Sequence, residues 1–412
     1  MKGAGMYVQR FAEEKFLRYS RNFKAVTVSG PRGAGKTVML KHLAEPGRTY
    51  VSLDDTDTLA LARTDPKMFF MRYRPPVIID EAQKAPVLYQ YIKLICDSTD
   101  ERSLFWMASS EEYTFLHTDC ESLAGRQGLI SLYPLSYAEV RGIRFTDPFD
   151  LSFEHLLSRS RQAGECNTAD LFRYIWQGGL PEAQGLSLPE RREYYEGYML
   201  IPLLKDAVYL CPGIQEAVFI RFLEACAGMI GQTVSCTALA KAAGISVSAA
   251  KKWISVLEGM HVLFLLPPYC SYGAMKGLCK RPVMYFTDTG LASYLAKWMT
   301  DEALMAGKQS SMFLRNYAAV EIMKDMEYRS VQCSLEHYRD SNGNEIPLIM
   351  TYNRDMHPLD IQMTDTPECS EVKKFQTLQN GIWDRSSGGI ICLCPSFCPL
   401  DRKNSIIPAN IL

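Results

Sequence analysis

The sequence predicts an α/β core with a parallel sheet, followed by helical regions and a second α/β domain. Three observations support this prediction. A glycine-rich stretch at 30–37 joins an apolar, strand-like run to a helix-like run. A second apolar run, 75–79, is followed directly by two acidic residues. Short apolar runs of this kind are typical of parallel strands covered on both faces. Helical spacing then dominates 146–230, and strand-like runs return from 334 onward.

The glycine-rich stretch reads GPRGAGKT and matches the phosphate-binding loop G-x-x-x-x-G-K-[ST] at every fixed position. Its glycines allow a tight turn in which successive N–H groups converge on an anion. Lys36 places a positive charge near the β and γ phosphates, and Thr37 offers a hydroxyl to Mg²⁺. The helix that follows favours negative charge at its N-terminus. The predicted nucleotide-binding residues are Gly30, Pro31, Arg32, Gly33, Ala34, Gly35, Lys36, Thr37 and Val38.

Asp80 and Glu81 follow the second apolar run. In a parallel sheet, they lie at the carboxyl end of their strand, beside the phosphate-binding loop. We expect Asp80, with Thr37, to hold Mg²⁺ and Glu81 to orient and polarise the attacking water. Water as the acceptor favours an ATPase over a kinase, which is the weaker alternative. The residues do not exclude guanine, although the sequence has no Asn-Lys-x-Asp run.

Two further residues are candidate catalytic groups. A third strand is predicted at 103–108, and Ser109 follows it. Ser109 could contact the γ-phosphate, but serine at a strand end is also a common turn former. Arg126 could reach the γ-phosphate, in cis or from a neighbouring copy, as charge develops during the reaction. The alternative for Arg126 is an ion pair or a contact at the edge of the sheet.

The chain resembles the bacterial and archaeal proteins in which an AAA-type ATPase domain precedes a C-terminal DUF4143 domain. This AAA_14/DUF4143 family is similar to the STAND-type ATPases, the signal-transduction ATPases with numerous domains. The resemblance spans nearly the full length, and it rests on segments 30–37, 52–55, 78–83, 121–126, 133–136, 178–182, 266–269 and 285–291. It implies the architecture more firmly than the biology, because such proteins are mostly uncharacterised.

A length of 412 residues predicts two to four domains. The regions we expect are a P-loop ATPase core at 1–145, a helical lid at 146–230, a winged helix-turn-helix at 231–300 and a degenerate restriction-endonuclease-like (DUF4143) domain at 301–412. Basic and acidic residues nearly balance, 45 against 46, so no global field draws the protein to nucleic acid.

The cysteines and the hydropathy predict a cytoplasmic protein. Thirteen cysteines are too dilute for a disulfide scaffold, and no signal peptide precedes them. No run approaches the ~20 apolar residues that span a bilayer. Cys392, Cys394 and Cys398 are spaced like half of a zinc site, but no second group of ligands stands at a suitable spacing. Buried thiols are therefore the favoured interpretation.

A helix-turn-helix is predicted at 235–257. Ser235 caps a short helix that ends at Gly244, and Ser246 opens a second helix. Strand-like runs at 262–266 and 283–286 would complete a winged form. Such a unit either contacts DNA phosphates or serves as a packing module beside the ATPase core. The residues that would contact DNA are Lys251, Lys252, Lys276, Lys280 and Arg281.

The last region resembles the restriction-endonuclease-like fold. An Asn-Gly pair at 342–343 between the runs 334–339 and 345–350 predicts a hairpin, followed by a third strand at 358–363. A helix near 369–379 and a strand at 389–392 complete the order.

In that fold, an acid on the second strand and an acid-x-lysine on the third bind Mg²⁺ and activate water. Here Pro347 replaces the first acid and Gln362 the lysine, and only Asp360 persists. Arg315, ahead of Asn316, replaces an upstream acid. The sequence therefore predicts that this domain is not a nuclease. A proline within a strand also predicts an edge or a bulge there.

The predicted function is a slowly hydrolysing, Mg²⁺-dependent ATP switch in which contacts to the γ-phosphate hold one arrangement and hydrolysis releases it. The alternative is a binding module. In that case the nucleotide is structural, and the C-terminal regions bind DNA or a partner protein without useful turnover.

Overall fold

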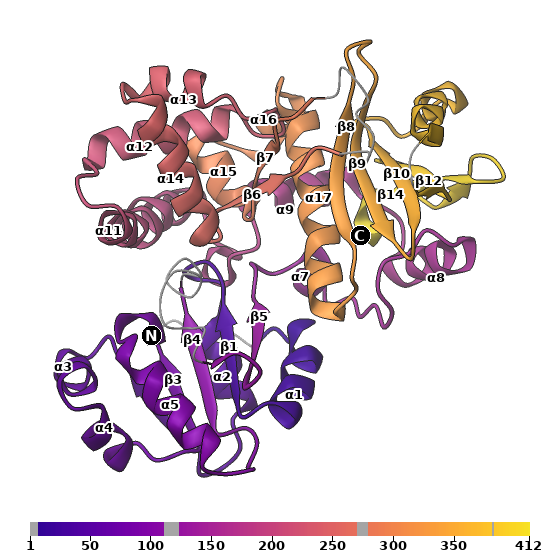
Figure 1. Ribbon diagram of the computed structural model, residues 1–412. Coiled ribbons are helices and arrows are strands. Elements are labelled where there is room, and N and C mark those ends of the chain that lie inside the picture. Colours follow the sequence, from indigo (N-terminus) through magenta and orange to yellow (C-terminus); the bar gives the residue numbers. More distant parts are fainter. Residues whose placement is uncertain (1–6, 111–122, 270–278, 381–382) are drawn as a thin grey trace. The chain divides into compact units, whose positions relative to one another are not determined.

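The computed structural model describes residues 7–110, 123–269, 279–380 and 383–412 (Figure 1). The chain divides into two compact units. The first consists of Met1–Pro134 with Val256–Val262, and the second of Leu135–Ser255 with Leu263–Leu412. Residues 135–145, which were predicted to belong to the ATPase core, therefore pack within the second unit.

A five-stranded parallel sheet forms the centre of the first unit, in the order β2-β3-β4-β1-β5. Its strands are β1 (Ala25–Ser29), β2 (Thr49–Ser52), β3 (Val77–Asp80), β4 (Phe105–Ser109) and β5 (Gln127–Ser131). The strands β1, β3 and β4 are buried along their whole length, as their apolar sequences predict. The predicted parallel α/β sheet is confirmed.

Helices surround this sheet in Figure 1. They are α1 (Ala12–Asn22), α2 (Lys36–Leu43), α3 (Thr56–Thr64), α4 (Pro66–Arg72), the 3-10 turn η1 (Ala82–Lys84) and α5 (Val87–Asp97). The side chains of Asp55 and Asp65 cap α3 and α4 by accepting hydrogen bonds from the backbone N–H groups of Thr58 and Met68. The apolar side chains of α5 pack into the core between helices and sheet.

The second unit begins with helices. They are α7 (Tyr137–Arg141), α8 (Phe153–Ala163), α9 (Thr168–Gln177), η3 (Pro181–Ala183), α10 (Leu188–Glu193), the π-helical η4 (Tyr194–Leu200), α11 (Ile201–Leu210) and α12 (Glu216–Gly228). This helical content matches the prediction for 146–230.

The predicted helix pair is also present. Ser235 accepts a hydrogen bond from the N–H of Ala238 at the start of α13 (Cys236–Ala243), which ends at Gly244 in a left-handed conformation. The second helix, α14 (Val247–Gly259), follows after three residues. The expected strands β6 (Leu263–Leu266) and β7 (Val283–Phe286) pair antiparallel. The helices α15 (Thr289–Leu295) and α16 (Asp301–Ala306) come next.

The C-terminal part of the second unit is a seven-stranded mixed sheet beside α17 (Ser310–Arg329). Its main order is β13-β14-β12-β10-β9-β8, with β11 paired to β10. The remaining elements are β8 (Ser334–Arg339), β9 (Glu345–Tyr352), β10 (Asp355–Ile361), η5 (Cys369–Asn380), β11 (Asp384–Arg385), β12 (Gly388–Cys392), β13 (Cys398–Pro399), β14 (Asn404–Pro408) and η6 (Ala409–Ile411). The predicted hairpin, third strand, helix and following strand are all present.

Pro347 lies in an internal strand, because β9 pairs with both β8 and β10. Of the two predicted alternatives, an edge or a bulge, the edge is therefore excluded. The predicted bulge is confirmed: Glu336 pairs with Ile349 while Tyr338 pairs with Ile346, so two residues of β9 face one of β8. A bulge releases a backbone position from the ladder, which suits a residue without an N–H group.

A buried ion pair joins α8 to α17. The guanidinium of Arg159, whose residue is 1% exposed, lies 3.2 Å from the carboxylate of Asp325. It also donates hydrogen bonds to the carbonyls of Asp147 and Ile411. The other carboxylate oxygen of Asp325 accepts the N–H of Phe149. This pair therefore ties four segments of the second unit together.

Within the described ranges, none of the helices combines the length and the apolar character that crossing a membrane requires.

Candidate nucleotide-binding site

The glycines of the phosphate-binding loop adopt conformations that other residues rarely do. The φ angles of Gly30, Gly33 and Gly35 are 151°, 80° and 92°. A Cβ atom on Gly30 would stand 2.0 Å from the carbonyl oxygen of Leu132. Glycine is therefore required at this position by close approach as well as by backbone angle.

Lys36 opens α2 and is buried. Its ammonium donates hydrogen bonds to the carbonyls of Gly30 at 2.8 Å and Pro31 at 3.0 Å, so it lies over the loop. A second cation, Arg10, supports the loop through a hydrogen bond of 2.8 Å to the carbonyl of Ala34. Arg10 could not be predicted from the sequence, because no motif links it to the loop.

The two residues expected to hold a metal lie together. The hydroxyl oxygen of Thr37 is 2.9 Å from each carboxylate oxygen of Asp80. Asp80 ends β3 and is 7% exposed. A hydroxyl and a carboxylate are hard oxygen donors of the type that Mg²⁺ prefers, so this donor set fits the ion.

Tyr50 on β2 adds a contact that the sequence did not suggest. Its hydroxyl donates a hydrogen bond of 2.8 Å to Asp80. Burial, followed by the hydrogen bond to Asp80, raises the pKa of Tyr50 to about 12. The ammonium of Lys41 lies 3.5 Å from the centre of the Tyr50 ring.

Glu81 stands in a left-handed backbone conformation, with φ 55°. This conformation costs about 1 kcal/mol or more for a residue with a Cβ, so the surroundings hold it. One oxygen of the carboxylate accepts hydrogen bonds from the amide of Gln83 at 2.6 Å and the hydroxyl of Ser110 at 2.9 Å. The serine in contact with Glu81 is therefore Ser110, the residue after the predicted Ser109. A γ-phosphate contact by Ser109, which ends β4, stays a prediction.

Arg126 lies at the amino end of the parallel strands, whereas the phosphate-binding loop lies at their carboxyl end. It precedes β5, and its carbonyl accepts the N–H of Ala25, the first residue of β1. The loop instead follows the last residue of β1. The guanidinium of Arg126 pairs with Asp97, and this hydrogen bond holds the pKa of the Asp97 carboxyl below its usual value. The position contradicts the γ-phosphate contact in cis, whereas a contact from a neighbouring copy stays a prediction.

Comparison with known proteins agrees with this geometry. Residues 22–141 match the family model of the AAA domain. The chain carries an AAA domain. Residues 168–302 match a domain of unknown function, DUF8612. The expected DUF4143 domain is not shown by these comparisons.

The chain is also similar to individual proteins. The uncharacterized proteins Rv2008c of Mycobacterium tuberculosis and Mb2031c of Mycobacterium bovis are each 23% identical over 366 residues, which cover 88% of this chain and 75% of the relative. The solved Walker-type ATPase PABY2304 of Pyrococcus abyssi is 13% identical, with a TM-score of 0.44, covering 70% of this chain and 96% of that chain.

One histidine from beyond the AAA match belongs to the same unit as the phosphate-binding loop. His261 lies in the segment Val256–Val262 and is 5% exposed. Burial, and then the charge of Lys36, lower its pKa to about 4. The sequence offered no signal for this residue, since the histidines are scattered and form no motif.

The low pKa of His261 predicts that the first unit loses stability in acid. The unfolded chain binds a proton near pH 6.5 that the folded chain rejects until about pH 4. Neutral His261 therefore costs the folded state nothing above pH 6.5. As the pH falls from 6.5 toward 4, the free energy of unfolding decreases, and the loss reaches about 2 kcal/mol at pH 5. Urea denaturation at pH 8 and pH 5 should show this loss in the wild type and a smaller loss in His261→Gln. Equal losses in both proteins would contradict the prediction.

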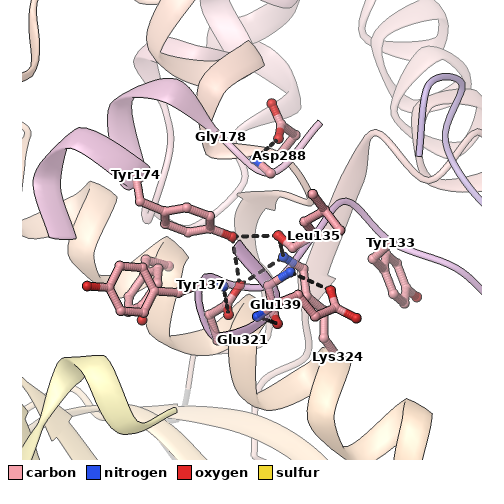
Figure 2. Close-up of polar contacts among 12 residues, drawn as sticks. Tyr133, Leu135, Tyr137, Glu139, Tyr174, Gly178, Asp288, Glu321 and Lys324 are labelled. Carbon is pink, nitrogen blue, oxygen red and sulfur yellow. Dashed lines mark hydrogen bonds and ion pairs between the residues drawn. The ribbon is translucent and has the colours of Figure 1, made fainter. Parts of the chain in front are cut away.

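The second unit contains a polar cluster around Glu321 on α17, which contacts the first residues of that unit, Leu135 and Tyr137. Figure 2 shows the hydroxyl of Tyr174 donating to the carbonyl of Leu135 at 2.7 Å and to Glu321 at 3.2 Å. Glu321 also accepts the N–H of Tyr137 and the ammonium of Lys324, each at 2.8 Å. The first residues after the AAA domain's unit are thus fixed by groups from α9 and α17.

Asp288 extends this cluster. Its carboxylate accepts the N–H of Gly179 at 2.8 Å and the N–H of Leu291 at 2.7 Å, where it caps α15. Burial raises its pKa. Three of the segments that supported the family resemblance therefore supply residues to this cluster in the second unit. They are 133–136, 178–182 and 285–291. Of segment 121–126, residues 121–122 lie outside the described residues.

The residues of the second unit that were predicted to contact DNA are exposed, except for one that lies outside the described residues. Lys251 and Lys252 on α14 are exposed, as are Lys280 and Arg281 ahead of β7. Lys276 lies outside the described residues.

In the C-terminal sheet, Asp360 is 2% exposed and its charge is already paired. One carboxylate oxygen accepts the amide of Gln362 at 2.6 Å and lies 2.9 Å from the ammonium of Lys374 on η5. Arg315 pairs with Glu345. Among the residues that the structure describes, no group of three histidine, cysteine or acidic side chains is placed to hold a metal ion.

Proposed function

We propose that this protein binds ATP with Mg²⁺ and hydrolyses it slowly, as a molecular switch of the AAA/STAND type. The observation that carries the proposal is the meeting of the loop with Asp80 at the end of β3, directly before Glu81. The hydroxyl of Thr37 lies 2.9 Å from the Asp80 carboxylate, and the buried Lys36 stands one residue before it. Phosphate-binding N–H groups, a cation, metal donors and a carboxylate for water are thus present in one place.

In this proposal, each residue has a separate task. The loop N–H groups and Lys36 bind the phosphates, and Thr37 with Asp80 would hold Mg²⁺, which neutralises phosphate charge when bound. Glu81 accepts a proton from the attacking water or orients it. The hydrogen bonds from Gln83 and Ser110 to one oxygen of the Glu81 carboxylate fix its orientation, and the second oxygen would accept the water.

Metal removal tests the proposal. The purified full chain is expected to release phosphate from ATP with Mg²⁺ and to stop when EDTA removes the metal, while GTP serves as the comparison nucleotide. Release of phosphate that EDTA leaves unchanged would contradict the assigned metal role. A wild-type chain that binds no nucleotide would refute the proposal, and one that binds ATP without turnover would favour a binding module.

The binding module is the second candidate, and the exposed cations Lys251, Lys252, Lys280 and Arg281 favour it. If α14 contacts DNA phosphates, duplex affinity will fall as salt rises. The double variant Lys251→Ala/Lys252→Ala should reduce the slope of log affinity against log salt by about 2. Fluorescence anisotropy with a labelled duplex measures this. Lys205→Ala/Lys308→Ala removes the same charge from other exposed sites. An equal change in both double variants would argue against a specific surface.

We further propose that the restriction-endonuclease-like DUF4143 domain predicted for the C-terminal region does not cleave DNA. The pairing of Asp360 with Gln362 and Lys374 supports this, because that carboxylate is already neutralised by protein groups.

A further inference from the structure

A tyrosine on an edge strand of the five-stranded parallel sheet donates a hydrogen bond to the carboxylate that is proposed to hold the metal. Tyr50 belongs to β2, which ends the strand order beside β3. Its hydroxyl lies 2.8 Å from Oδ2 of Asp80. The Tyr50 residue is 38% exposed, so its ring is only partly buried, and its hydroxyl is directed toward Asp80.

The contact from Tyr50 supplies something that Thr37 does not. The hydroxyl of Thr37 is equally distant, 2.9 Å, from Oδ1 and Oδ2 of Asp80. One symmetric donor leaves the rotation of the carboxylate plane weakly defined, because the terminal torsion of aspartate is broad. Tyr50 bonds Oδ2 alone and approaches from a different element. Donors on α2 and β2 together define the orientation of the carboxylate.

Lys41 holds the Tyr50 ring in place. Its ammonium lies 3.5 Å from the ring centroid, within the range of a cation–π interaction. Lys41 is one helical turn after Thr37 on α2. The helix that follows the phosphate-binding loop is thus linked to the Asp80 site twice, directly by Thr37 and through the ring of Tyr50.

We propose that Tyr50 is a positioning residue that holds the Asp80 carboxylate in the orientation needed by a bound divalent cation, with Lys41 steadying the ring. The inference rests on the proposed function, since it concerns the same metal. Groups that bond to metal ligands from outside the coordination shell typically change metal affinity 10–100-fold. Tyr50→Phe removes only the hydroxyl and should weaken the binding of a divalent cation about tenfold.

The test uses the full chain with Mn²⁺ as a paramagnetic substitute for Mg²⁺. Mn²⁺ is titrated in the presence of ATP, and the free ion is measured by electron paramagnetic resonance. Tyr50→Phe should show about tenfold weaker metal binding, and Lys41→Gln about threefold. Tyr91→Phe is the matched control, because Tyr91 on α5 packs against the core of the same unit. ATP affinity in EDTA should be unchanged in all three variants.

The outcomes separate the two ideas. Metal binding by Tyr50→Phe within twofold of the wild type, while ATP binding and turnover persist, would overturn the role of Tyr50 alone. Equal weakening in Tyr91→Phe, or a matching loss of metal-free ATP affinity, would assign the effect to general loosening and overturn it too. A wild-type chain that binds no ATP, with or without Mn²⁺, would refute the proposed function and this inference together.

Discussion

Replacing Glu81 with glutamine is expected to lower ATP turnover about a hundredfold or more while ATP binding is retained. Removing a general base costs 10²–10⁴-fold in rate, about the range expected here. Glutamine keeps the shape of the side chain and can still accept the hydroxyl of Ser110, which now lies 2.9 Å from the carboxylate. The left-handed turn at this residue should therefore be preserved, and only the charge that serves water is lost.

Lys36→Ala should separate from Glu81→Gln in the binding measurement. It removes the cation proposed to contact the phosphates, and hydrogen bonds to charged groups contribute about 1.5–3 kcal/mol each. ATP affinity should fall at least about tenfold. Phosphate release and equilibrium binding of a fluorescent ATP analogue measure the two effects. Glu101→Gln, exposed in the same unit, is the matched control. Full turnover in Glu81→Gln would contradict the assignment of the base.

Arg159→Met is expected to destabilise the second unit by about 3–5 kcal/mol, because it leaves the Asp325 carboxylate buried without its counter-charge. Arg159 is 1% exposed and also loses its bonds to two carbonyls. Urea denaturation of the full chain measures the effect. If the two units unfold in separate transitions, ATP should shift only the transition of the first unit. The transition that ATP does not shift belongs to the second unit and should move to lower urea in Arg159→Met, whereas the other should stay in place.

Two further variants make this prediction specific. Arg161→Met removes an exposed arginine from the same helix and should change stability little. The double variant Arg159→Met/Asp325→Leu should recover part of the loss, because replacing both members of a buried pair by apolar groups is often close to neutral. A double variant less stable than Arg159→Met would show that hydrogen bonding, and not the unpaired charge, dominates.

The sequence predicted the proximity of those residues of the candidate nucleotide site whose positions depend on local spacing. The loop, Thr37 and Asp80 follow from a strand-loop-helix unit and a second strand, and the parallel sheet brings them together. Tyr50 and Ser110 could not be predicted in this way. Tyr50 is 30 residues before Asp80, and Ser110 is 29 after Glu81, so only the pairing of strands places them in contact.

The error at Arg126 has a related cause. The half-buried strand β5 alternates between buried and partly exposed residues, unlike the fully buried strand β1 beside it, and it was not predicted. Without that strand, the sequence did not show that Arg126 precedes it. A residue directly before a parallel strand lies at the amino end of the sheet, away from the loop at the carboxyl end. Arg126 therefore does not reach the γ-phosphate position in cis.

Because the first unit includes the separate segment Val256–Val262, no single division of the chain separates the two units. A recombinant fragment ending at Pro134 would contain the loop and both acids but would lack His261. A fragment starting at Leu135 would carry that segment away from the residues it packs with. Expression trials and limited proteolysis should therefore treat the first unit as made from two separated stretches of the chain, best recovered by joining them through a short engineered linker.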